Sequence, residues 1–245
     1  MELSKTQIDQ LGERLKEGDI TEADLRLLDA YRRSFTEAYE VVIIAIRAVF
    51  RLEPTGRPAK STTSIADKLR RETIRLTQIQ DIAGCRLTVS DIAEQEQVVQ
   101  FLSTIFKDTL IVDRRQNPSH GYRAVHLIVR HQAKMVEVQV RTSLQHLWAE
   151  LSEKLSDVFD PMLKYGEGNK FVKMLLSNTS LMVADLEAKE RQISEAWERV
   201  LAHEDTNADW ELIAATEGHI DAQRETMLTH IRDMIEQAES LKRRQ

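Results

Sequence analysis

Three polar side chains alternate with valines near the middle of the 245-residue chain and could carry out acid–base chemistry. They are Glu137, Gln139 and Arg141, and the two-residue period of a β-strand would place all three on one face. A carboxylate can accept the proton of a hydroxyl group, while an amide and a guanidinium donate hydrogen bonds and neutralise phosphoryl charge. An ordinary amphipathic strand with a solvated face has the same pattern. These three residues therefore indicate an active site only in combination with other functional residues.

A second carboxylate, Asp81, stands just before a stretch with strand-like alternation that contains Arg86. Mg²⁺ prefers one or two carboxylates together with substrate phosphates and waters, so Asp81 and Glu137 could hold this ion across a sheet. Arg86 could bind phosphate from the polar face of its strand. Alternatively, Asp81 caps a turn and Arg86 is a surface charge.

An aromatic residue follows a glycine where another strand is predicted to begin. On one continuous strand Tyr122 and His126 would share a face, so a nucleobase could stack on the ring while the imidazole reaches a phosphate or a sugar. Simple packing of the tyrosine is the alternative.

Basic residues are concentrated in a loop and a short helix upstream of Asp81. Several of these cations could converge on a triphosphate, because ammonium and guanidinium groups bind phosphate oxygens. A solvated helix face would show the same composition. The basic residues are Arg57, Lys60, Lys68, Arg70 and Arg71, and they surround Ser64.

The periodicity of the apolar residues predicts an α+β fold, with a mixed β-sheet flanked by helices. The segment 1–51 is predicted to be helical and to contain one long amphipathic helix from Thr21 to about Phe50. The segment 52–160 should form the core that carries the chemistry, and 161–245 a C-terminal helical hairpin. The predicted elements are a loop over 52–63, strands at 85–89, 110–113, 123–130 and 135–141, and helices over 64–72, 92–106, from Thr142, over 171–203 and over 210–241.

Composition excludes several classes of protein. The formal net charge of −6 opposes non-specific binding to nucleic acid, and Cys85 is the only cysteine, so neither an intrachain disulfide nor a thiolate metal cluster is expected. Residues 1–10 lack the apolar core of a signal peptide. The most apolar stretch, 41–46, is far shorter than the ~20 residues of a membrane span. A cytoplasmic protein is therefore expected.

The motifs together resemble the synthetase domain of the RelA/SpoT homologue family, in particular its single-domain small alarmone synthetases. The resemblance extends from about Ala45 to Leu155. It is carried by Arg57, Lys60, Ser64-Ile65 and Lys68-Leu69, by Asp81-Ile82-Ala83-Gly84, by Gly121-Tyr122-Arg123 with His126, by Glu137-Val138-Gln139-Val140-Arg141-Thr142, and by Trp148-Ala149-Glu150.

This resemblance implies a nucleotidyltransferase-like sheet and an enzyme that moves the β,γ-diphosphate of ATP to the ribose 3′-hydroxyl of GDP or GTP. Mg²⁺ would be the cofactor, held by Asp81 and Glu137, with Glu137 also the base and Gln139 beside it. Tyr122 would stack on guanine. The implied ATP-binding residues are Arg57, Lys60, Ser64, Lys68, Arg71 and Arg86, and the implied acceptor-binding residues are Tyr122, His126, Arg141, His146 and Arg115.

The chain departs from the family pattern at several positions. Two residues rather than one separate Arg57 from Lys60, and the loop before Gly121 has no lysine. His146 stands where many small synthetases have an asparagine, and Glu153-Lys154 replaces a His-Lys pair. No His-Asp dipeptide is present, so the family's hydrolase domain is expected to have no counterpart.

The sequence is also compatible with two alternative functions. A toxin of the same fold would pyrophosphorylate the 3′ end of tRNA or make adenosine alarmones, and an antitoxin would then be a partner. A catalytically inactive scaffold would self-associate as a homo-oligomer through its helical segments. A tRNA acceptor needs a basic surface, for which the candidates are Lys164, Lys170, Lys173, Arg114 and Arg115.

Overall fold

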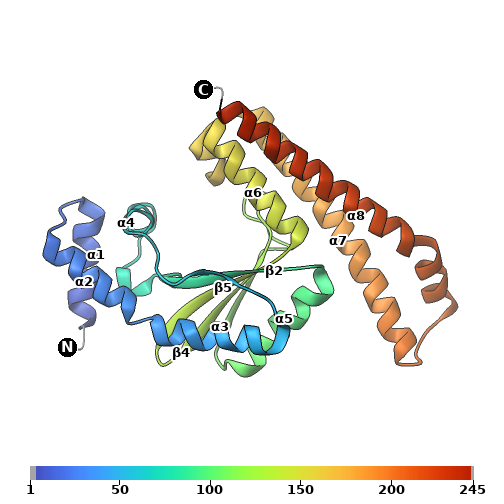
Figure 1. Ribbon diagram of the computed structural model, residues 1–245, viewed down its shortest axis with the longest axis horizontal. Helices are drawn as coiled ribbons and strands as arrows, with labels where there is room; N and C mark the ends of the chain where they lie inside the picture. Colours follow the sequence, from blue (N-terminus) through green and yellow to red (C-terminus); the bar gives the residue numbers. More distant parts are fainter. Residues whose placement is uncertain (1–3, 244–245) are drawn as a thin grey trace. The chain divides into compact units, whose positions relative to one another are not determined.

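The computed structural model describes residues 4–243, apart from the side chain of Glu217 (Figure 1). The ends of the predicted segments 1–51 and 161–245, residues 1–3 and 244–245, lie outside the described residues. The chain forms two compact units. The first comprises the described residues up to Leu87 with Val99–Val112 and His126–Gln139, and the second comprises Thr88–Val98, Asp113–Val125 and the described residues from Val140 onward.

The predicted α+β class is confirmed, with five strands in one sheet and helices around them. No helix within residues 4–243 is long and apolar enough to cross a membrane. The elements are α1 (Lys5–Glu17), α2 (Glu22–Arg33), α3 (Thr36–Phe50), β1 (Thr55–Arg57), α4 (Thr62–Arg71), η1 (Leu76–Gln78), β2 (Ala83–Val89), α5 (Ile92–Ile105), β3 (Leu110–Asp113), β4 (Val125–His131), β5 (Lys134–Thr142), α6 (Ser143–Val158), η2 (Pro161–Tyr165), α7 (Lys170–Leu201) and α8 (Asn207–Lys242).

The sheet has the strand order β1-β2-β5-β4-β3, which makes β2 and β5 direct neighbours. β1 was predicted as loop, and it pairs antiparallel with β2, with Arg57 opposite Gly84. A Cβ atom on Gly84 would lie 2.7 Å from the carbonyl oxygen of Glu137, so only glycine allows this approach. The predicted alternation on β5 is confirmed, because Val136 and Val138 are fully buried while Glu137 lies on the other face.

A hairpin between β4 and β5 was predicted and is confirmed. Its turn consists of Gln132 and Ala133, which both have positive φ, at 45° and 62°. This left-handed conformation at two central residues suits the right-handed twist of the flanking strands. The Gln132 amide donates a hydrogen bond to Glu37 on α3 at 2.9 Å, so the turn is held against a helix of the same unit.

The prediction of one long helix over 21–50 is wrong, because α2 and α3 are separated at Ser34 and Phe35. The Ser34 hydroxyl donates a hydrogen bond to the carbonyl of Tyr31 at 2.6 Å. Such a local bond competes with the regular helical pattern and favours a break. The apolar spacing continues through the break, since Tyr31 and Phe35 are both buried, and periodicity alone therefore could not reveal it.

The first unit also contains α1, which lies in the segment predicted to be helical but was not predicted as a separate helix. Ser4 and Gln7 form a reciprocal capping box at its start, and Ile8, Leu11 and Leu15 are buried on one face. These side chains join a core formed with α2, α4 and η1. α4 is the short basic helix of the sequence, so this core fixes the helix that carries Lys68.

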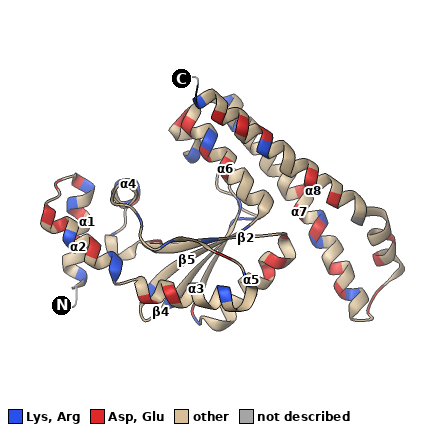
Figure 2. Ribbon diagram, in the orientation of Figure 1, with Lys and Arg blue, Asp and Glu red and all other residues tan. Residues whose placement is uncertain are grey.

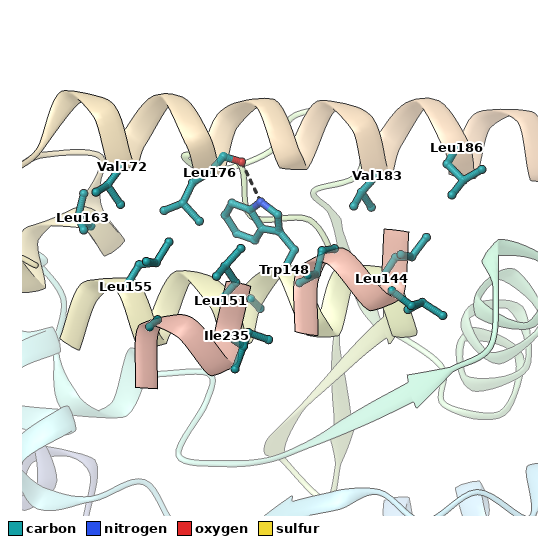
Figure 3. Packing of buried hydrophobic residues seen from close by; sticks show 14 of the residues in the cluster. Leu144, Trp148, Leu151, Leu155, Leu163, Val172, Leu176, Val183, Leu186 and Ile235 are labelled. Atoms are coloured by element: carbon teal, nitrogen blue, oxygen red, sulfur yellow. Dashed lines mark hydrogen bonds between the residues drawn. The ribbon is translucent and has the colours of Figure 1, made fainter. Parts of the chain in front are cut away.

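The second unit contains the predicted C-terminal helices, and both are confirmed. α7 and α8 run side by side (Figure 1) and pack with α6 around a shared apolar core (Figure 3). Trp148 of α6 is buried in this core, and its indole nitrogen donates to the carbonyl of Leu176 at 2.8 Å. Lys154 of α6 forms an ion pair with Glu239 of α8. The C-terminal helices are thus an integral part of this unit.

Candidate active site

Asp81 is surrounded by three cations in the first unit. Its carboxylate lies 2.5 Å from Lys60 Nζ, 3.1 Å from Lys68 Nζ and 3.3 Å from Arg57 Nη2. Burial raises the pKa of Asp81, but the hydrogen bond from Lys60 and the charges of Lys60 and Lys68 lower it further, to about 2. The carboxylate is therefore ionised at neutral pH, and three positive groups converge where it lies.

Glu137 is held through both of its carboxylate oxygens. Oε1 lies 2.8 Å from Nδ1 of His126 on β4, and Oε2 accepts a hydrogen bond from Gln139 Nε2 at 2.9 Å. Burial raises the pKa of Glu137, but the contacts with His126 and Gln139 outweigh both burial and the charge of Asp81, so its pKa is lowered. The result is an ionised and oriented carboxylate that can accept a proton.

A pocket of about 150 Å³ joins Glu137 to the polar face of the neighbouring strand. Arg57 on β1 and Arg86 on β2 line it together with Glu137 and Gln139 on β5. Burial raises the pKa of Cys85, which also lines the pocket, to about 12, so its thiol is no nucleophile at neutral pH. The pocket combines two guanidinium groups, an amide and a carboxylate, which is a set suited to binding phosphate next to a proton acceptor.

Tyr122 and Arg141 form a contact in the second unit. Nη2 of Arg141 donates to the tyrosine hydroxyl at 2.9 Å, and its guanidinium carbon lies 4.9 Å from the centre of the ring. Tyr122 lies in a tight turn, where it forms an isolated bridge with Ser119. The regular strand begins only at Val125, so the prediction that Tyr122 shares a strand face with His126 is wrong.

Known proteins are similar to this chain over the region that contains these residues. Residues 56–156 match the family model for the region found in RelA / SpoT proteins. The small alarmone synthetase 1 from Bacillus subtilis, solved with its product pppGpp, is 27% identical with a TM-score of 0.54, over 71% of this chain and 98% of that one. The structure of smu.1046c from Streptococcus mutans UA159 is 28% identical with a TM-score of 0.53, over 72% and 98%.

Residues 56–156 therefore form a region similar to the one found in RelA / SpoT proteins, and the fold resembles that of small alarmone synthetases. Among curated relatives, an uncharacterised protein of Mycobacterium bovis is 38% identical over 116 residues, which is 46% of this chain and 42% of that protein. The GTP pyrophosphokinase YwaC of Bacillus subtilis is 34% identical over 122 residues, 42% of this chain and 58% of that protein. The match thus spans about half the length of these relatives.

Within this RelA/SpoT region, the other predicted ATP-binding residues lie around α4. Ser64 belongs to the first turn of α4, where its backbone N–H donates to the N-cap hydroxyl of Ser61 at 3.2 Å. Arg71 lies in the last turn, half-exposed, with Glu72 as an ion-pair partner at 3.5 Å. Ser64 and Arg71 thus lie near opposite ends of α4.

Two predicted acceptor-binding residues lie elsewhere in the second unit. Arg115 is paired with Asp113 at 2.6 Å and with Glu96 at 3.2 Å, and it lines a separate pocket with Arg123 and Arg191. His146 is partly buried on the first turns of α6. The structure of the second unit therefore brings Tyr122 together with Arg141, and it gives Arg115 acidic partners of its own.

Sequence reasoning missed Ser180 of α7, which holds the turn before Tyr122. The Ser180 hydroxyl donates to the carbonyl of Gly121 at 2.6 Å and accepts from Arg123 Nε at 3.1 Å. Gly121 has a φ of 90°, and a Cβ atom there would lie 2.7 Å from the ring of Trp148. The Gly-Tyr-Arg motif is thus fitted between α6 and α7.

Glu187 of α7 was also missed, and it holds the end of β5. Its side chain is buried, with 4% of the residue exposed, and it accepts hydrogen bonds from Thr142 Oγ1 at 2.5 Å and Gln145 Nε2 at 3.0 Å. Thr142 is the N-cap of α6 and follows Arg141 directly. No short motif could indicate this contact, because 45 residues separate Glu187 from Thr142.

Replacing Glu187 with Gln should change the pH dependence of stability. Burial raises the pKa of Glu187, so the folded state binds its proton more tightly than the unfolded state does. The stability contributed by this proton is fully present below the ordinary glutamate pKa and is lost as pH rises through the folded value. The Tm of Glu187→Gln minus the Tm of the wild type should increase by about 2–4 °C from pH 4 to pH 8, as measured by thermal unfolding. A constant difference, as expected for the exposed control Glu40→Gln, would contradict this.

Proposed function

We propose that this chain is a pyrophosphokinase that transfers the β,γ-diphosphate of ATP to the ribose 3′-hydroxyl of GDP or GTP and releases AMP. The observation that carries the proposal is the ionised Glu137, held by His126 and Gln139 in a pocket that also contains Arg57 and Arg86. Two relatives support it, one named GTP pyrophosphokinase and one solved with its product pppGpp.

The donor triphosphate would bind to the cations around Asp81. Lys60, Lys68 and Arg57 carry three positive charges against one carboxylate, which leaves an excess of two. A site with this excess attracts a triphosphate. When phosphate oxygens bind these cations, they compete with Asp81, and the carboxylate becomes available for another partner.

Mg²⁺ would be that partner. Among residues 4–243 no three His, Cys, Asp or Glu side chains form a ready-made metal site. Mg²⁺ usually takes one or two carboxylates with substrate phosphates and waters, and Asp81 and Glu137 lie close enough for the Asp81 charge to oppose ionisation of Glu137. These two carboxylates therefore fit the ion. When bound, Mg²⁺ would neutralise charge on the diphosphate that is transferred.

Glu137 would accept the proton of the acceptor hydroxyl. The 3′-oxygen then forms a bond to the β-phosphorus of ATP, and the bond from this phosphorus to the oxygen bridging it to the α-phosphate breaks, so that AMP leaves. His126 and Gln139 fix the direction in which the carboxylate points. Arg57 and Arg86 would neutralise the phosphate charge. In the second unit, Tyr122 offers a ring for stacking on the nucleobase and Arg141 a cation for phosphate.

Replacing Ser180 with Ala should weaken acceptor binding specifically. The substitution removes the hydrogen bonds with Gly121 and Arg123 on either side of Tyr122, and the loss of about 1 kcal/mol corresponds to about a fivefold increase in KM for GDP. The KM for ATP and the kcat should stay close to wild type, as they should for both substrates in the exposed control Ser177→Ala. Steady-state kinetics with each substrate varied in turn measures this, and an equal rise in both KM values would refute a local effect.

A nucleotide acceptor agrees better with the charge distribution than tRNA does. Lys and Arg residues are interspersed with Asp and Glu along α7 and α8 (Figure 2), so neither helix is uniformly basic. Two of the candidate basic residues have acidic partners, since Lys164 lies 3.8 Å from Asp157 and Arg115 lies 2.6 Å from Asp113. Self-association, an antitoxin and a tRNA acceptor stay predictions.

The purified chain should be incubated with γ-³²P-labelled ATP and Mg²⁺, and separately with GDP, GTP, no acceptor or deacylated tRNA. We expect label on GDP or GTP. Label on tRNA, or on an adenosine nucleotide without an added acceptor, would assign another substrate to the same site. No transfer to any acceptor would overturn the enzymatic proposal and favour a scaffold.

A further inference from the structure

A second pocket of the first unit is lined by neither Asp81 nor Glu137. Its volume is about 550 Å³, within the ~300–1,000 Å³ typical of small-molecule sites. α1 contributes Lys5 and Ile8, α2 contributes Tyr31, Phe35 comes from the break between α2 and α3, and β5 contributes Lys134. Ser34 and Phe35 of the break thus line this pocket, and the proposed reaction does not use it.

Lys134 is the central polar group of this pocket. Its ammonium nitrogen lies 4.7 Å from the centre of the Phe35 ring and 5.5 Å from that of Tyr31, and it donates to Ser34 Oγ at 2.8 Å. Burial lowers the pKa of Lys134, and no acidic residue offsets this. Two aromatic faces and a hydroxyl hold the cation in place without neutralising it.

Two carboxylates contact residues that line the pocket, and both already have partners. Asp9 accepts from the Thr77 hydroxyl at 2.6 Å and lies 3.8 Å from Arg75, and Glu37 accepts from Gln132 at 2.9 Å. Among residues 4–243, neither Lys134 nor Lys5 has an ion-pair partner, and no carboxylate lines the pocket. A partly buried cation without a counterion is costly, and an anion that enters the pocket would relieve this cost.

We propose that this pocket binds a small anion with a flat, apolar body. The anionic group would pair with Lys134 and Lys5. The flat body would contact Ile8, Ile79 and Met135, which give the pocket an apolar wall. An aromatic carboxylate and a nucleoside monophosphate both have this chemistry. The proposal does not depend on the proposed transfer reaction.

The test compares two probes that share an aromatic body and differ in charge. 8-Anilinonaphthalene-1-sulfonate is the anion, and N-phenyl-1-naphthylamine is its uncharged counterpart. We expect fluorescence titration to show one saturable site for the sulfonate, with affinity about tenfold lower in Lys134→Met and unchanged in the exposed control Lys107→Met. The uncharged probe should bind weakly and equally to all three proteins. No binding of the sulfonate, or binding insensitive to Lys134→Met, would overturn the proposal.

Hydrogen exchange locates the probe independently of the variants. The sulfonate should protect the amides of 131–135 in the wild-type chain, and ATP should not displace it. Protection confined to a pocket of the second unit, about 340 Å³ in volume and lined by Leu155, Phe159 and Met234, would refute the assignment, as would displacement by ATP. Benzoate and adenosine monophosphate are then tested separately for displacement of the sulfonate, which distinguishes the two classes of ligand. If neither compound displaces the sulfonate, this result also contradicts the proposed site.

Discussion

Substituting Glu137 with Gln should lower kcat for diphosphate transfer by about 100- to 10,000-fold, the range by which a general base contributes. The amide keeps the size of the side chain and can still hydrogen-bond with Gln139 and His126. It cannot take a proton from the acceptor hydroxyl. The contacts that hold β4 and β5 together are therefore retained while the proposed base is removed.

The rate should be measured under saturating ATP, GDP and Mg²⁺, with circular dichroism to verify that the variant is folded. Glu40→Gln is the matched control, because Glu40 is an exposed carboxylate of the same unit. We expect its kcat to equal that of the wild type. A Glu137→Gln enzyme with more than about a tenth of the wild-type kcat would contradict the role of Glu137 as the base.

Substituting Asp81 with Asn should have opposite effects on nucleotide binding and on catalysis. Asp81 neutralises part of the charge of Lys60, Lys68 and Arg57, so its removal leaves these cations free for phosphates. A charge-assisted hydrogen bond contributes ~1.5–3 kcal/mol, so metal-free ATP should bind about tenfold more tightly to the variant. Turnover with Mg²⁺ should fall by at least about 100-fold, since one carboxylate of the metal site is lost.

Isothermal titration with ATP in the presence of a chelator measures the first effect, and the rate at saturating Mg²⁺ measures the second. Asp108→Asn, an exposed change in the same unit, should alter neither quantity. If Asp81 only pairs with the lysines and binds no metal, the variant should still bind metal-free ATP more tightly but keep the wild-type rate at saturating Mg²⁺. That result would separate a structural role from a role in binding Mg²⁺.

The central strands were predictable because each repeats one simple pattern. The valines of β5 alternate with Glu137 and Gln139, and burial follows this alternation along the strand. The helices α7 and α8 were also predictable, because each is long enough to show a clear helical periodicity of apolar residues. The broken helix at Ser34 was not predictable in this way, because the apolar spacing continues through the break.

The side-chain partners of the site were less predictable than its elements. The sequence indicated that Lys60 and Lys68 bind phosphate and that Asp81 binds a metal, but not that the three groups pair with one another. The contacts of Ser180 and Glu187 join positions 42–59 residues apart, and no periodicity connects them. Contacts of this kind depend on how whole elements pack.

The most direct test of the account is to identify the products made from unlabelled ATP, GDP and Mg²⁺ by ³¹P nuclear magnetic resonance. We predict that AMP and a guanosine nucleotide with a diphosphate on its 3′-oxygen form in equal amounts, at a rate that Glu137→Gln abolishes. Formation of ADP with a single phosphate on the acceptor, or of AMP and free pyrophosphate without any modified acceptor, would contradict the proposed diphosphate transfer.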